Sequence, residues 1–171
     1  GVPQIIAGPA GKAISRLIGG AADIPAAWLE QKAQKIRDDT MARSAIVKAV
    51  AAASSHTAVA DEALLGRALD RYISEIYRKQ ENREGVAKQA VEALIDVPPS
   101  EGAVEPEADW MNVFERHAEN ATSDSMRQIW GRVLAGEIRK PNSISLATLN
   151  FFSLMDQPLA RAVEEVFPWI I

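Results

Sequence analysis

Apolar residues recur at intervals of three and four along most of this chain, a spacing that gathers them on one face of an α-helix. The longest such stretch lies between residues 62 and 94. Its apolar set is Leu65, Ala68, Leu69, Tyr72, Ile73, Ile76, Val86, Ala90, Val91 and Leu94. Gly85 closes a polar run, KQENREG at residues 79–85, which predicts a kink or short break near 80–85.

A second long helix is predicted upstream. Pro25 suits the first turn of a helix, and neither glycine nor proline follows until after Ser54. The break SSHTAVAD then offers Thr57 or Asp61 as the cap of the next helix. Two long helices joined by a short link pack as an antiparallel hairpin. Residues 9–19 predict a short helix before the hairpin, although nearby glycines oppose it.

Prolines and acidic residues dominate residues 96–108. The pair Pro98-Pro99 cannot continue a helix, and the segment contains no basic residue. We therefore expect an extended acidic linker there. It would join a long-hairpin region, residues 1–95, to a compact module, residues 109–171.

Three short helices are predicted in the compact module. Their expected caps are Asp109, then Thr122 or Ser123, then Ser143 or Ser145. Their expected inward residues are Trp110, Phe114, Ala118 and Ala121, then Met126, Ile129, Trp130, Val133 and Ile138, then Leu146, Leu149, Phe152 and Met155. No segment alternates apolar and polar residues with β-branched enrichment, so the predicted fold is all-α.

The turn RKPNSIS, residues 139–145, separates the last two helices. Arg139 and Lys140 come where helix carbonyls carry partial negative charge, Pro141 ends the helix, and Asn142 accepts turn geometry. An alternative reading is an anion-binding site built from Arg139, Lys140, Ser143 and Ser145. We favour a capped turn, because capping accounts for every residue without a ligand.

Gly131 and Gly136 lie inside the helix that precedes this turn. Glycine inside a helix costs about 1 kcal/mol relative to alanine. We therefore expect both residues to permit the close approach of a neighbouring helix or ring, with Trp130 as the obvious ring.

Composition narrows the chemistry. The 171 residues are 47% hydrophobic and include no cysteine, which excludes disulfides, cysteine-ligated metals and thiol catalysis. The net charge of −4 argues against a general nucleic-acid binder. The strongest hint of nucleic-acid binding is a basic stripe on the long helix, formed by Arg67, Arg71, Arg78 and Lys79. Interleaved acidic residues favour ion pairs within the helix instead.

Recognisable active-site motifs are missing from the sequence. There is no Walker loop, no Gly-x-Gly-x-x-Gly and no His-Glu-x-x-His, and neither His56 nor His117 has neighbours spaced as metal ligands. We expect no cofactor and no metal, and keep a hydrolase using His117 as a third hypothesis. No apolar run approaches the roughly 20 residues that span a bilayer. The ends suggest a fragment of a longer protein.

The stretch from Trp110 to Phe152 resembles the DUF2806 family of bacterial proteins of unknown function. The matching residues are Trp110, Phe114, Ser123, Trp130, Leu134, Ala135, Gly136, Glu137, Lys140, Pro141, Ser143, Ser145, Leu146, Thr148 and Leu149, with Gln80 and Asn82 upstream. Two residues depart from the family pattern: Asn142 replaces a glycine and Ala147 replaces an arginine. If that arginine pairs with the motif acid, Glu137 needs another partner here, such as Arg132, Arg139 or a helix N-terminus.

The resemblance implies a mostly helical, cytoplasmic bacterial protein without an established activity. Our first hypothesis is a non-enzymatic interaction or assembly module that self-associates or binds a protein partner through its alanine-rich long helices. The alternative is nucleic-acid, nucleotide or anion binding through the basic stripe or the 139–145 turn.

Overall fold

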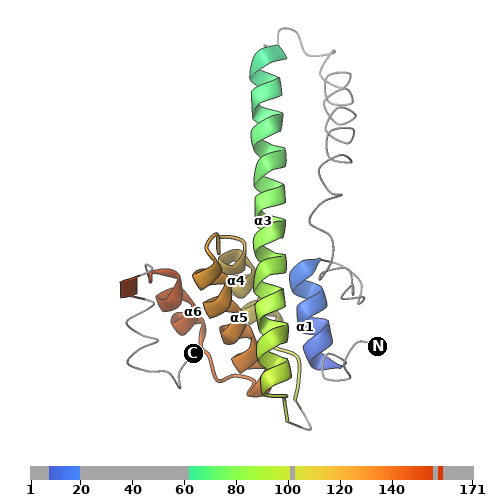
Figure 1. The fold of residues 1–171 in the computed structure, drawn as a ribbon, viewed down its shortest axis with the longest axis vertical. Helices are drawn as coiled ribbons and strands as arrows, with labels where there is room; N and C mark the ends of the chain where they lie inside the picture. The colour runs from blue at the N-terminus through green and yellow to red at the C-terminus, as the bar shows by residue number, and fades with distance from the viewer. Residues whose placement is uncertain (1–7, 20–61, 101–102, 156–157, 160–171) are drawn as a thin grey trace. The chain divides into compact units, whose positions relative to one another are not determined.

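The computed structural model describes residues 8–19, 62–100, 103–155 and 158–159 (Figure 1). The regular elements in these ranges are all helices: α1 (Pro9–Ile18), α3 (Glu62–Asp96), α4 (Ala108–Ala118), α5 (Asp124–Arg139) and α6 (Leu146–Ser153). The predicted all-α class is thus confirmed. The helix predicted from Pro25 to Ser54, and with it the hairpin, lies outside the described residues.

Helix α1 forms despite its flanking glycines because they stand at its two ends. Pro9 occupies the first turn, where its missing N–H costs nothing. Gly19 ends the helix in the left-handed conformation, with a φ of 71°, and its N–H bonds to the carbonyl of Arg16. The predicted short helix is confirmed.

Helix α3 runs without interruption from Glu62 to Asp96, so the break predicted near 80–85 is wrong. Apart from the exposed Glu81, the polar residues of this stretch are buried or partly buried. Asn82 is only 1% exposed and bonds to the α4–α5 connection. Gly85 lies beneath the side chain of Arg127, whose Cδ would be 2.6 Å from an added Cβ.

Side-chain caps start the last two helices but not α4. Ser123 accepts a hydrogen bond from the N–H of Met126 at 3.2 Å, and Ser145 accepts one from Thr148 at 3.1 Å, as predicted. Asp109 does not cap α4. It lies in the first turn of the helix, two residues after the N-cap residue Glu107. A negative charge there still favours the positive end of the helix.

The core joins α4, α5 and α6 around Trp130, which is 1% exposed. Phe114 and Phe152 both meet its ring edge-on, with centroids 5.7 and 6.5 Å away. The inward faces predicted for α4 and α5 are largely confirmed. On α6, Leu149 and Phe152 are buried, but Leu146 is 44% exposed, contrary to the prediction. As the first residue of α6, it lies beside the solvent-facing turn.

The chain forms two compact units. One consists of residues 1–24 and 79–171, and the other of residues 25–78. This division differs from the predicted one, because α3 passes from one unit into the other. Its second half packs against α5, and residues 96–108 connect α3 to α4 inside the first unit. Helix α1 belongs to that same unit, although much of the sequence separates it from Lys79.

Candidate functional site

The motif-rich turn at 139–145 closes over a buried carboxylate. Glu137 is 1% exposed and projects from the last turn of α5. Its two carboxylate oxygens accept hydrogen bonds from the N–H of Asn142 at 2.6 Å, the N–H of Ile144 at 2.9 Å and the hydroxyl of Ser143 at 3.4 Å. The turn therefore holds an anion that belongs to the chain itself.

Tryptophan completes the closure of this turn from α4. The indole N–H of Trp110 donates to the carbonyl of Ile144 at 2.8 Å. Asn142 adopts a φ of 61°, the left-handed region that favours glycine and tolerates asparagine. This conformation accounts for asparagine where the family pattern has glycine. Without an arginine at Ala147, Glu137 is satisfied by N–H and hydroxyl donors instead.

Arg139 points away from the turn toward the end of α3. Its guanidinium donates to the carbonyl of Val97 at 2.7 Å and also to that of Ala93. Burial lowers the pKa of Arg139, and the charge of Asp96 opposes this shift. Arg139 thus donates to the carbonyl of Val97, just beyond α3, and adds a second donor to that of Ala93, which also accepts from the N–H of Val97 at 3.1 Å.

The residues proposed for anion binding are therefore divided among several tasks. Ser143 faces Glu137, and Ser145 caps α6 and lies 2.9 Å from the hydroxyl of Thr148. Lys140 is exposed, and Pro141 is partly so. The structure brings together Glu137, Trp110 and Ser143, but it directs Arg139 elsewhere. Anion binding by this turn stays a prediction.

Histidine 117 lies beside the aromatic core. Its ring stacks on Trp130 with centroids 5.0 Å apart and planes 8° from parallel. Its Nε2 is buried without a hydrogen-bond partner. Burial lowers the pKa of His117; a hydrogen bond with the Asn150 side chain raises it, and the charge of Arg116 lowers it further. These contacts describe a histidine packed against the aromatic core.

Two polar residues of α3 secure its neighbours. Gln80 donates to the carbonyl of Ile18, at the end of α1, at 2.9 Å. Asn82 donates to the carbonyl of Glu119 at 2.7 Å and accepts from Arg127 at 3.0 Å. Both belong to the Gln-x-Asn segment of the family pattern. The polar run that suggested a break is thus the part of α3 that ties α1 and α5 to it.

A half-buried ionic cluster joins α1, α3 and α4. Arg16 pairs with Glu115 at 2.9 Å, and Arg83 pairs with Glu119. Lys79, which was assigned to the basic stripe, lies 3.7 Å from Glu119. Sequence reasoning missed this cluster, although the spacing of Glu115 and Glu119 by four residues on α4 was a usable signal. No group of potential metal ligands occurs in the part of the chain that the structure describes.

The other members of the basic stripe, Arg67, Arg71 and Arg78, are exposed on the first half of α3. Steps of four and seven residues place them along one side of the helix. The structure thus keeps three of the four residues of the predicted stripe together and assigns Lys79 to the ionic cluster.

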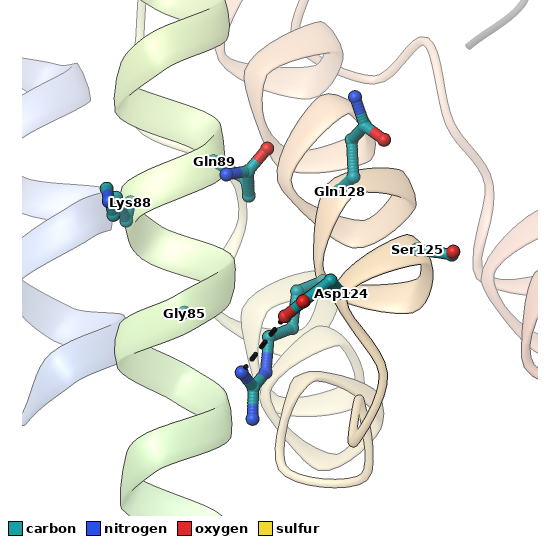
Figure 2. A pocket seen from close by; sticks show the side chains of 7 residues that line it. Gly85, Lys88, Gln89, Asp124, Ser125 and Gln128 are labelled. Atoms are coloured by element: carbon teal, nitrogen blue, oxygen red, sulfur yellow. Dashed lines mark hydrogen bonds and ion pairs between the residues drawn. The ribbon is translucent and has the colours of Figure 1, made fainter.

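An open depression lies between α3 and the start of α5, with a volume of about 520 Å³ (Figure 2). It is lined by Gly85, Lys88, Gln89, Asp124, Ser125, Arg127 and Gln128. Arg127 is committed to contacts within the chain, with Asp124 at 3.4 Å, Asn82 and the carbonyl of Ala121. The lining contains no pair of groups arranged for acid–base or nucleophilic chemistry.

A search of the described helices finds none with the length and apolarity needed to cross a membrane. No curated protein and no solved structure matches the chain. A family model does match: that of DUF2806, described as a protein of unknown function, over residues 66–168. This range includes the second half of α3, the Glu137 turn and the aromatic core, and the chain therefore belongs to the DUF2806 family.

Proposed function

We propose that this chain is a non-enzymatic helical assembly module that self-associates through the first half of α3. The observation that supports the proposal is an apolar face there, formed by Leu69, Tyr72 and Ile76. Tyr72 is 63% exposed and Ile76 is 48% exposed, whereas Ile73, at one edge of the same face, is 7% exposed. The apolar face of this part of α3 is thus covered at one edge and open over the rest.

The open face continues a surface that packs elsewhere on the same helix. Steps of three and four residues lead from Leu69, Tyr72 and Ile76 to Val86 and Ala90, both fully buried. A helix face that is exposed only to water usually carries polar residues. Large apolar side chains there are typical of a surface that meets another protein.

A second copy suits the balanced charge of this segment. Residues 62–78 contain three acidic residues, Glu62, Asp70 and Glu75, and three basic ones, Arg67, Arg71 and Arg78. A segment without net charge does not repel a second copy of itself. A strongly acidic or basic partner would be met by a surface of the opposite sign.

Light scattering behind size exclusion tests this proposal across a range of concentrations. We expect the mass to rise from 18.6 kDa toward a multiple of it as concentration increases. The double variant Tyr72→Glu/Ile76→Glu should stay monomeric, because association would bury two added charges. The control Arg71→Glu/Arg78→Glu, on the side of α3 opposite the apolar face, should associate like the natural chain. A monomeric natural chain at every concentration would exclude self-association.

Nucleic-acid binding is the second candidate, supported by the exposed row of Arg67, Arg71 and Arg78. The same two double variants separate it from assembly. Fluorescence anisotropy with a labelled RNA or DNA at low salt should show binding that salt weakens and that Arg71→Glu/Arg78→Glu abolishes. The Tyr72→Glu/Ile76→Glu variant should retain such binding. Absence of binding by the natural chain at low salt would remove this candidate.

A further inference from the structure

Helix α1 is seated in the first unit as a separate amphipathic helix. Its buried face consists of four residues, which are between 0% and 2% exposed: Ala10, Ala13, Ile14 and Leu17. Their spacing of three and four residues is that of a helix laid into a groove. The contacting elements are α5, α4 through Arg16, and α3 through Gln80. Figure 1 shows α1 beside the second half of α3.

Polar contacts fix how α1 lies in this groove. Arg16 donates to Glu115 at 2.9 Å, to the side chain of Asn112 at 2.7 Å and to the carbonyl of Ala108 at 3.2 Å. Gln80 takes the carbonyl of Ile18 at 2.9 Å. The groove therefore recognises one apolar face, one arginine and the C-terminal end of the helix. This is the specificity of a binding site for a helical peptide.

The chain around α1 leaves the helix free to be supplied by another molecule. In the sequence, residues 19–61 separate α1 from the start of α3, the helix that carries Gln80. Gly8 and Gly19 flank it, with φ values of 73° and 71°, and neither would touch another atom through an added Cβ. The contacts between α1 and its groove are non-covalent, so the same contacts can form within one chain or between two.

We propose that α1 of one copy occupies the α3–α4–α5 groove of a second copy, so that two chains assemble by exchanging this helix. The inference rests on the proposed self-association and names a contact that would hold the copies together. Exchange preserves every contact of the seat, so the exchanged and closed forms differ mainly in how the intervening chain runs. High protein concentration therefore favours exchange, and dilution favours the closed form.

The absence of cysteine from the sequence makes the exchange directly measurable. Chains carrying Arg16→Cys and chains carrying Asn112→Cys are mixed at high concentration and treated with a short bismaleimide. We expect a covalent pair of chains, which mass spectrometry identifies as one of each kind. Arg16→Cys mixed with Leu154→Cys serves as the control, because Leu154 is 82% exposed at the end of α6. That mixture should give little cross-linked pair.

Doubly substituted chains show whether α1 still docks after the changes. Arg16→Cys/Asn112→Cys in one chain should cross-link within that chain at low concentration. A second pair, Ile18→Cys with Gln80→Cys, leaves Arg16 in place and is read in the same way. If neither doubly substituted chain cross-links at low concentration, α1 does not occupy this groove and the inference falls.

The result also separates this inference from the proposed function. Dimers seen by light scattering, together with cross-links confined to single chains, would overturn helix exchange and leave assembly through α3 standing. Monomers at every concentration would overturn both. Mixed covalent pairs that also form with Tyr72→Glu/Ile76→Glu would support exchange while removing the α3 face as the interface.

Discussion

Adding one methyl group at the crossing of α3 and α5 should weaken the fold, because the two backbones meet there at Gly131. A Cβ at this position would lie 2.8 Å from both the backbone nitrogen of Ala90 and the carbonyl carbon of Gln89. These are backbone atoms in the middle of a continuous helix, so they cannot rotate aside as a side chain would. Gly131→Ala therefore requires the two helices to separate or tilt.

The size of the effect follows from two opposing contributions. Overpacking a filled core costs about 1–3 kcal/mol, and a clash with backbone belongs at the upper end. Replacing glycine by alanine inside a helix returns about 1 kcal/mol. We therefore expect Gly131→Ala to lower the free energy of unfolding by about 1–2 kcal/mol.

Gly136 supplies a matched control in the same helix. An added Cβ there would meet only the Cδ1 of Ile144, at an ordinary contact distance of 3.7 Å. Gly136→Ala should thus keep the gain in helix propensity and raise the free energy of unfolding by about 0.5–1 kcal/mol. The expectation that both glycines permit close approach holds for Gly131, where the neighbour is α3 rather than the ring of Trp130.

Urea unfolding followed by helical circular dichroism measures both variants against the natural chain. A change in midpoint at constant slope reports a change in stability. Equal urea midpoints for Gly131→Ala and Gly136→Ala would refute the reasoning.

Three further predictions concern the turn and the histidine. Glu137→Gln should lower the free energy of unfolding by about 1–3 kcal/mol, because an amide N–H₂ replaces an acceptor that faces N–H groups; equal urea midpoints would contradict this. Asn142→Gly should be neutral or stabilising at a φ of 61°, whereas Asn142→Val should lower the thermal midpoint; equal midpoints for these two variants would count against a strained turn. Because burial lowers the pKa of His117 below its ordinary 6.5, the folded chain binds fewer protons than the unfolded one as pH falls through 6.5. The contribution of His117 to stability should decrease over that interval and become constant below its folded pKa. His117→Gln should reduce the pH dependence in urea titrations at several pH values, and an unchanged dependence would contradict this.

Local spacing in the sequence was enough to predict the all-α class, the short helix α1 and the caps Ser123 and Ser145. These features depend on residues three or four positions apart, so the chain needs no distant contact to specify them. The same holds for the inward faces of α4 and α5, which meet around Trp130. The family motif could also be recognised, because its residues cluster within a short stretch.

Distant contacts decided the remaining features. The run at residues 79–85 has the composition of a break in the helix. Its Gln80 and Asn82 nevertheless donate hydrogen bonds to α1 and to the α4–α5 connection. Glu137 was expected to pair with arginine or a helix end, and instead accepts N–H and hydroxyl groups from its own turn. Composition cannot separate these outcomes, because a polar side chain stabilises a helix, a turn or a linker according to which donors and acceptors the fold brings to it. Sequence spacing therefore specified where helices form, and tertiary structure decided which buried polar groups would meet.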